Sequence, residues 1–251
     1  FKVLMYALLI ISFLVLIQGL YKKLLFVSGT KGLKNLKGEG GLIPPELNWK
    51  SFFQTIFFTG KVTRKSYVGF FHSLIYYGFI ILWIATDLVA IHFDTPFKVF
   101  QGPVYIIVSF LADIAGIAIL IGLLFAYHRR YIKKPDTLSS TKPKSELYMY
   151  SLIGSLVIIG YVIEGIRIYG TGMPIGEKTW APVGYLLASL FQQFQATDQT
   201  WASLYQGLWL FHMVSTMVFV ASIGHTKFFH IIGIPLRFFK SSNSSFLYCL
   251  I

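Results

Sequence analysis

The chain contains five apolar stretches that are each long enough to cross a lipid bilayer as one α-helix. About 20 residues, at a rise of about 1.5 Å each, span the hydrocarbon layer of about 30 Å. Only helices and closed barrels satisfy all backbone polar groups in lipid. We expect the spans at about 3–26, 67–91, 104–127, 147–168 and 204–230. The sequence therefore predicts an all-α integral membrane protein with five transmembrane helices.

Composition agrees with a membrane protein and argues against several other classes. Hydrophobic residues make up 55% of the 251 residues, charged residues only 13%, and the mean hydropathy is +0.65. The net charge of +12 would suit a nucleic-acid binder, but the basic residues cluster between the apolar stretches, as topology signals do. We therefore expect a lipid bilayer, and no nucleic acid, as partner. The single cysteine, Cys249, excludes an internal disulfide and a cysteine-ligated cluster within the chain.

The order of the segments predicts one membrane domain over residues 1–251, without an internal repeat. The segment WKSFFQTIFF at 49–58 is amphipathic and too short to cross, so we expect an interfacial helix there. Nine Lys and Arg residues fall between Lys22 and Lys65, and six between Arg129 and Lys144. The positive-inside rule then places the N-terminus outside and the C-terminus in the cytoplasm.

The last apolar stretch carries histidines at both of its ends. His212 and His230 are eighteen residues apart. On one continuous helix this is five turns, so both rings would share a face and lie about 27 Å apart. His225 would point away from that face. A polar ring in lipid needs a partner, so the pair is either two axial heme ligands or two interfacial histidines hydrogen-bonded to neighbours.

A second histidine at matching depth would complete a heme site, because bis-histidine heme takes its ligands from two helices. His72 lies near the cytoplasmic end of the second span, at the same depth as His230, and we expect these two to form a pair. Three glycines nearby, Gly69, Gly78 and Gly233, leave room for a flat macrocycle or serve ordinary close helix packing.

The residues alone do not identify a second heme ligand that would pair with His212 at the outer level. His92 has about the right depth, but it is twenty residues beyond His72 and turns about 200° away on a helix. It can swing back only if the second span unwinds before it. A five-coordinate heme, or Met173 as the ligand, is the alternative.

Three charged residues at or within the spans are candidates for quinone binding or proton transfer. Asp113 lies in the middle of the third span, and a lone intramembrane carboxyl is a functional candidate unless it is a hydrogen-bonded helix contact. Asp87 and Arg167 lie near the outer ends of their spans. Arg167 follows Glu164 by three residues, so the two can pair on one helix face.

Several of these residues resemble a known group of membrane subunits. The resemblance rests on Phe71-His72, the His212–His230 spacing followed by IIGIP, LLFAYHRRYIKKP after the third span and GYVIEGIRIYG in the fourth. Over residues 60–238 the chain resembles the heme b gamma subunit of respiratory nitrate reductase. It also resembles the membrane subunits of heterodisulfide reductase and of iron–sulfur electron-transfer-flavoprotein:quinone oxidoreductases.

The resemblance implies heme b held by histidines. By matching positions, His72 and His230 would bind the iron of an inner heme, and His212 the iron of an outer heme. The nitrate reductase subunit has a further histidine at the position that is Leu82 here. This departure leaves the sixth ligand of the outer heme open, with His92 as the candidate.

The resemblance also implies a function. Such subunits pass electrons between a quinone and a cytoplasmic iron–sulfur partner, in the respiratory chain of the prokaryotic cytoplasmic (inner) membrane. Quinone would be the substrate of this subunit, and the other half-reaction of the oxidoreductase complex would occur on the partner. The iron–sulfur clusters would belong to that partner, which is either another polypeptide or a continuation of the chain.

Two other functions stay open on the sequence alone. One is a proton-coupled transporter with a path through Asp113 and the histidines, although the chain has no repeat symmetry and few polar residues in its spans. The other is a passive membrane anchor without heme. A pyridine hemochrome spectrum separates both from the heme-binding function.

The orientation gives the first testable prediction. A cysteine placed at Ser140, in the basic segment after the third span, should not react with a membrane-impermeant reagent added to intact cells, because this segment is expected in the cytoplasm. The measurement is the labelled fraction before and after permeabilisation. Ready labelling in intact cells would reverse the orientation.

Overall fold

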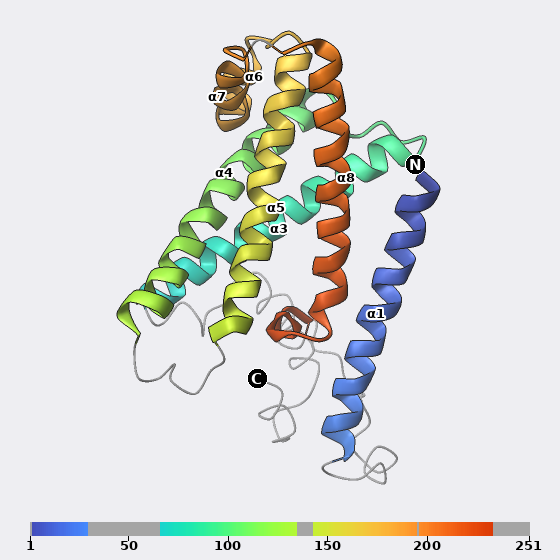
Figure 1. Ribbon diagram of the computed structural model, residues 1–251, viewed down its shortest axis with the longest axis vertical. Helices are drawn as coiled ribbons and strands as arrows, with labels where there is room; N and C mark the ends of the chain where they lie inside the picture. Colours follow the sequence, from blue (N-terminus) through green and yellow to red (C-terminus); the bar gives the residue numbers. More distant parts are fainter. Residues whose placement is uncertain (1, 30–65, 135–142, 195, 233–251) are drawn as a thin grey trace. The chain divides into compact units, whose positions relative to one another are not determined.

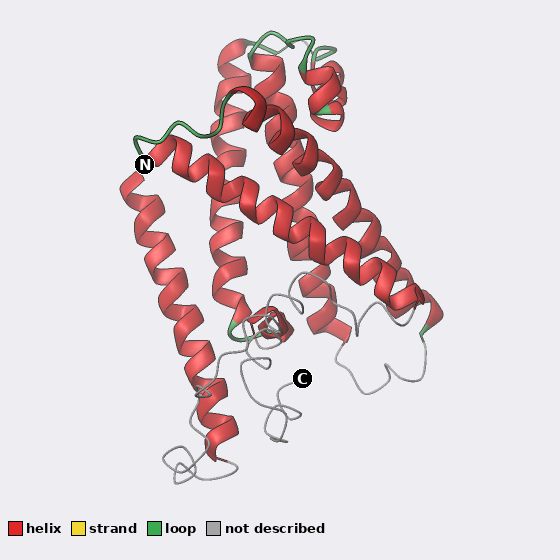
Figure 2. Cartoon of the chain, turned by 180° about the vertical axis from the view of Figure 1, so that it is seen from behind, coloured by secondary structure: helices red, strands yellow, loops and turns green. Residues whose placement is uncertain are grey.

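The described part of the chain is built from helices alone. The computed structural model describes residues 2–29, 66–134, 143–194 and 196–232, with no strand among them (Figures 1 and 2). The elements are α1 (Lys2–Gly29), α3 (Ser66–Asp94), α4 (Gly102–Tyr127), a π-helical turn η2 (His128–Lys133), α5 (Pro143–Gly170), α6 (Glu177–Trp180), α7 (Pro182–Phe191), α8 (Asp198–Ile223) and a 3-10 turn η4 (Lys227–Phe229). Five of them, α1, α3, α4, α5 and α8, are long and apolar enough to cross a membrane, which confirms the predicted helical class and number of spans. The interfacial helix predicted at 49–58 lies outside the described residues.

The last span ends earlier than the sequence predicts. One helix was expected over 204–230, but α8 ends at Ile223 and a turn leads into η4. Gly224 follows the helix, and the Thr226 hydroxyl accepts a hydrogen bond from the Phe228 backbone N–H, which caps the next turn. The prediction of one continuous helix was therefore wrong, and neither a shared helix face nor a rise of about 27 Å follows for the two histidines.

The third span is longer than predicted. It was expected to end at 127, but η2 continues it to Lys133, and Lys134 then takes a left-handed φ of 43°. Lys133 Nζ lies 5.1 Å from the centroid of the Tyr67 ring. A basic side chain over an aromatic ring at a helix end is favourable, and it keeps this basic turn folded against α3.

The chain divides into two compact units. The larger contains residues 62–143 and 150–213, and therefore α3, α4, α6, α7 and most of α5 and α8. The smaller contains residues 1–61, 144–149 and 214–251, and therefore α1, the start of α5 and the end of α8. The expectation of a single membrane domain over 1–251 stays a prediction.

In the larger unit, α3 and α4 approach closely through glycines. A Cβ atom added at Gly78 would lie 2.7 Å from Ile119 Cγ1 and 2.8 Å from the Ala115 carbonyl oxygen. A Cβ atom at Gly122 would lie 2.9 Å from the Phe71 carbonyl oxygen. Small residues let helix backbones pack closely in lipid, where no hydrophobic effect drives helices together. These two glycines therefore serve α3–α4 packing.

The fifth helix packs on the other side of α4. Ile119 and Leu123 of α4 and Val157 of α5 form a buried cluster. Leu82 of α3 packs against the same cluster. The Tyr161 hydroxyl of α5 donates a hydrogen bond to the Asp113 carbonyl oxygen of α4. These contacts make α3, α4 and α5 the frame that holds the polar residues described below.

In the smaller unit, α1 is attached to the turn after α8. Gly19 and Gly224 meet backbone to backbone, since a Cβ atom on Gly19 would lie 2.8 Å from Gly224 Cα. Lys23 Nζ donates to the Thr226 carbonyl oxygen at 3.0 Å and lies 4.3 Å from the centroid of the Phe229 ring. At the same turn, Lys227 forms an ion pair of 2.6 Å with Glu146 of α5. The turn is therefore fixed from two sides.

The α3–α4 contact gives a prediction about stability. Gly78→Ala should lower the free energy of unfolding by about 1–3 kcal/mol, because its methyl group would press against the backbone of α4. Gly207→Ala is the matched control, since Gly207 is also helical and has nothing within 4 Å of an added Cβ. The measurement is the unfolding midpoint in mixed detergent micelles. Equal midpoints for both variants would contradict the close approach.

Candidate functional site

His230 is held in a defined tautomer by the backbone. Its Nδ1 lies 2.6 Å from the Lys227 carbonyl oxygen, one turn earlier. A carbonyl oxygen only accepts hydrogen bonds, so Nδ1 carries the proton, and Nε2 of the neutral ring carries the lone pair. Metal-binding histidines commonly show this hydrogen bond, which orients the ring and strengthens the ligand. His230 therefore fits an axial ligand to heme iron.

By contrast with His230, the neutral rings of His225 and His92 each carry the proton on Nε2. His225 Nε2 donates to the Val15 carbonyl oxygen of α1 at 3.1 Å. His92 Nδ1 accepts the Phe100 backbone N–H at 3.2 Å, so its neutral ring carries the proton on Nε2. In addition, α3 continues to Asp94, so the unwinding that would turn His92 toward the outer heme position is not seen. This geometry does not favour His92 as an iron ligand.

His212 and His72 both belong to the larger unit. His212 Cε1 lies 3.7 Å from the place that a Cβ would take on Gly160 of α5, so this glycine leaves space beside the ring. The His72 ring stacks on Tyr76 at 6.4 Å with an interplanar angle of 17°. His230 belongs to the smaller unit, and the pairing of His72 with His230 stays a prediction.

Three residues that were considered for the heme sites, apart from the histidines, have packing roles. Gly78 lies in the α3–α4 contact, where the methylene of Ile119 fills the space that a macrocycle would need. Leu82 packs on the α4–α5 core. Met173 packs against the buried cluster of Ile168, Ala181 and Ala188. Among the described residues, no three His, Cys, Asp or Glu side chains are arranged to hold a metal ion by themselves.

A charged cluster joins three helices of the larger unit. Arg167 Nη2 of α5 lies 2.7 Å from Glu164 Oε1, which confirms the predicted i,i+3 pair. The same nitrogen donates to the Tyr105 hydroxyl of α4 at 2.8 Å. That hydroxyl in turn donates to Glu177 Oε1 of α6 at 2.5 Å. Tyr105 and Glu177 were missed from the sequence, because they are 72 residues apart and no local spacing links them.

Asp113 has a structural partner. The carboxylate is buried, with 5% of the residue exposed, and Oδ2 accepts the Val183 backbone N–H at 2.8 Å. Val183 lies in the first turn of α7. This helix begins at Pro182, and its first N–H groups have no partner within the helix. Asp113 thus acts as a cap that attaches α7 to α4. This is the hydrogen-bonded helix contact that the sequence left open as the alternative to a functional carboxyl.

Asp87 and Trp201 differ in their exposure. Asp87 is exposed on α3, and no ion-pair partner is found for it within the described ranges. Trp201 is buried, with 9% exposed, between Tyr169 and Phe191, whose ring centroids each lie 5.3 Å away. Trp201 therefore belongs to the packing of α5, α7 and α8.

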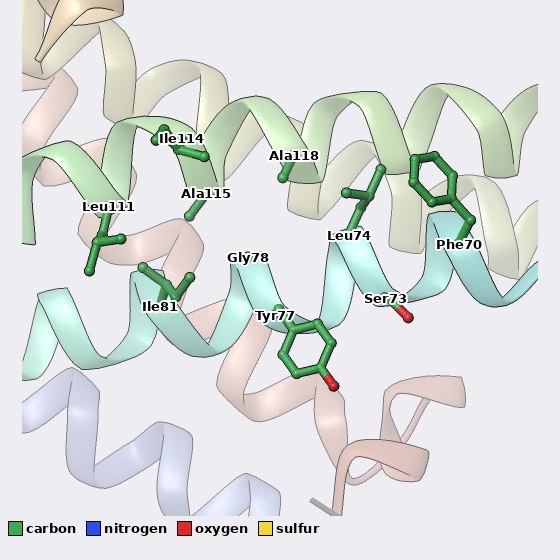
Figure 3. A pocket seen from close by; sticks show the side chains of 10 residues that line it. All are labelled: Phe70, Ser73, Leu74, Tyr77, Gly78, Ile81, Leu111, Ile114, Ala115 and Ala118. Carbon is green, nitrogen blue, oxygen red and sulfur yellow. The ribbon is translucent and has the colours of Figure 1, made fainter. Parts of the chain in front are cut away.

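An apolar hollow of about 250 Å³ lies between α3 and α4. Figure 3 shows Leu74 and Ile81 of α3 facing Leu111 and Ala115 of α4 across it, whereas the Ser73 hydroxyl turns away from α4. Its lining can contact a hydrocarbon chain but offers no hydrogen bond. The polar end of a quinone would therefore need other residues, such as the charged cluster.

Two named oxidoreductases are similar to this chain in sequence. An EtfAB:quinone oxidoreductase of Syntrophomonas wolfei subsp. wolfei is 32% identical over 196 residues, which cover 75% of this chain and 27% of that protein. The probable iron-sulfur-binding oxidoreductase FadF of Bacillus subtilis is 22% identical over 193 residues, which cover 76% of this chain and 26% of that protein. The chain therefore spans about a quarter of the length of these relatives. No known protein-family model and no solved structure matches it.

The chain is thus related to oxidoreductases named for quinone and for iron–sulfur binding. This agrees in part with the resemblance drawn from the residues, and specifically with its flavoprotein:quinone oxidoreductase group. Neither name mentions heme, so heme binding stays a proposal.

Two substitutions at Asp113 distinguish a helix-capping role from a role in carrying protons. Asp113→Ala should speed the hydrogen exchange of the α7 amides and lower the free energy of unfolding by about 0.5–2 kcal/mol, as loss of a cap does. Asp113→Asn keeps an accepting oxygen and should preserve both the exchange rates and quinone-dependent activity. Exchange is measured by mass spectrometry on peptides from α7. Loss of activity in the Asn variant with unchanged exchange would identify Asp113 as a proton carrier instead.

Proposed function

We propose that this chain is the membrane cytochrome b part of a quinone-linked respiratory oxidoreductase. It would pass electrons between a membrane quinone and a cytoplasmic iron–sulfur partner. The observation that carries the proposal is the similarity to an EtfAB:quinone oxidoreductase over a region whose described part is a membrane-type helical protein with half-buried histidines at 72, 212 and 230. The partner is another polypeptide or a further part of the same protein.

The residues proposed to hold heme are His72, His230 and His212. The hydrogen bond from His230 Nδ1 to Lys227 supports a ligand role for Nε2. The gap that Gly160 leaves beside His212 supports a group next to that ring. His72 is proposed as the second ligand of the inner heme, and the sixth ligand of the outer heme stays open. Heme b would supply a one-electron carrier in the membrane.

The quinone is proposed to react at the outer ends of the spans, near Arg167. Arg167, Glu164, Glu177 and Tyr105 gather polar groups at the ends of α4 and α5, beside α6 and α7 (Figure 1). A quinone needs hydrogen bonds to its two oxygens and apolar contacts for its tail. Both are available in the larger unit. The bilayer would be the prokaryotic cytoplasmic membrane.

The ligand assignment predicts which histidines remove heme. His72→Ala and His230→Ala should each abolish the same low-spin heme, because the loss of either axial ligand removes its site. His212→Ala should remove a second heme and leave the first unchanged. The measurement is heme per chain by pyridine hemochrome, together with low-temperature optical spectra of the reduced protein.

His128→Ala is the matched control, since His128 lies in η2 and has no assigned role. It should retain full heme content. One heme per unmutated chain, still present in the His212 variant, would reject the outer site. No heme in the unmutated protein would reject the proposed function.

A further inference from the structure

The charged cluster contains more negative than positive charge. Arg167 faces two carboxylates, at 2.7 Å from Glu164 and at 3.4 Å from Glu177. Glu164 and Arg167 are each about one-third exposed, whereas the Glu177 side chain is only 10% exposed. The better pair is thus Arg167 with Glu164. The buried carboxyl of Glu177 therefore shares Arg167 with Glu164, and no second cation forms an ion pair with it among the described residues.

One oxygen of Glu177 has a vacant hydrogen-bonding position. Oε1 accepts from the Tyr105 hydroxyl and lies within 3.5 Å of both Arg167 terminal nitrogens. Oε2 is buried and has no hydrogen-bond partner among the described residues. A buried carboxyl oxygen is rarely left in this state, so the site fits a hydroxyl, a carbonyl or water that exchanges a proton with it. This orphaned oxygen is the observation that points to a ligand.

We infer that Glu177 exchanges a proton with the quinone headgroup, an inference that rests on the function proposed above. Reduction of a quinone forms two O–H bonds and takes up two electrons and two protons. Glu177 supplies one proton to a quinone oxygen, water supplies the other, and the electrons come from the iron–sulfur partner. In the opposite direction, the carboxylate receives one quinol proton and water receives the other, and the two electrons leave to the partner.

The groups around Glu177 suit this exchange. Tyr105 of α4 and Arg167 of α5 fix Oε1 and leave Oε2 to the ligand. Glu164 balances Arg167, and its stem lies against Gly184 of α7. Asp113 of α4 faces the backbone of α7 and is already hydrogen-bonded there. Glu164 and Arg167 are each about one-third exposed, so the cluster is not closed off and a proton can be replaced through this pair.

The test compares Glu177→Gln with Asp198→Asn in membranes that contain the intact complex. Asp198 is an exposed carboxyl in the first turn of α8, so this control makes the same chemical change elsewhere. Glu177→Gln should lower kcat with the soluble quinol menadiol by ~100-fold or more, with little change in KM, and should flatten the pH profile. Glu177→Asp should recover part of the rate. Asp198→Asn should match the unmutated protein.

Infrared difference spectra of the unmutated complex give a second readout. Quinone reduction should change a carboxyl C=O band, which disappears in Glu177→Gln, remains in Asp198→Asn and shifts in Tyr105→Phe. If the unmutated complex reacts with menadiol but shows no such band, the inference is overturned and the function stands. An unchanged kcat and pH profile in Glu177→Gln would overturn the inference in the same way. If the unmutated complex carries heme but does not react with quinol, both fail.

Discussion

A polar side chain within a bilayer cannot bond to water, so it must find its partner inside the protein. This requirement explains the contacts at one end of the larger unit. Asp113 bonds to the backbone of α7, and Arg167 connects α5 with α4 and, through Tyr105, with α6. The short helices α6 and α7 thus provide hydrogen-bond partners for polar side chains of the spans α4 and α5. Within the charged cluster, and among the described residues, Glu177 Oε2 is a buried carboxyl oxygen without such a partner, and it is therefore the best candidate for a ligand contact.

Close helix packing makes these polar contacts possible. Gly78 and Gly122 let the backbones of α3 and α4 approach closely, and α4 carries Tyr105 and Asp113 of the polar contacts. Gly160 differs from them, because a Cβ there would only touch His212 at an ordinary distance of 3.7 Å. The glycines therefore divide into those that join helices and one that borders a candidate ligand. Their spacing in the sequence does not distinguish the two kinds.

The sequence was sufficient for the spans, since an apolar run of about 20 residues can cross the hydrocarbon layer as one helix that satisfies its own backbone. It was also sufficient for the Glu164–Arg167 pair, which depends on helical spacing alone. It was insufficient for the end of α8, because Gly224 and Thr226 lie inside a run that hydropathy treats as continuous. It was insufficient for Glu177, because a loop returns this residue to α4 and no periodic pattern encodes that return.

The early end of α8 changes how the candidate ligand His230 is positioned. On one long helix, its ring would be placed by helical geometry alone. In the observed turn, its ring is instead placed by the backbone of η4 through Lys227. That turn is held by α1, through Gly19 against Gly224 and through Lys23 on Thr226. His225 is used in the same attachment, by its bond to Val15, which explains why a histidine so close to His230 is unsuited to the same role. The first helix therefore helps to position the candidate ligand His230, although it carries no histidine.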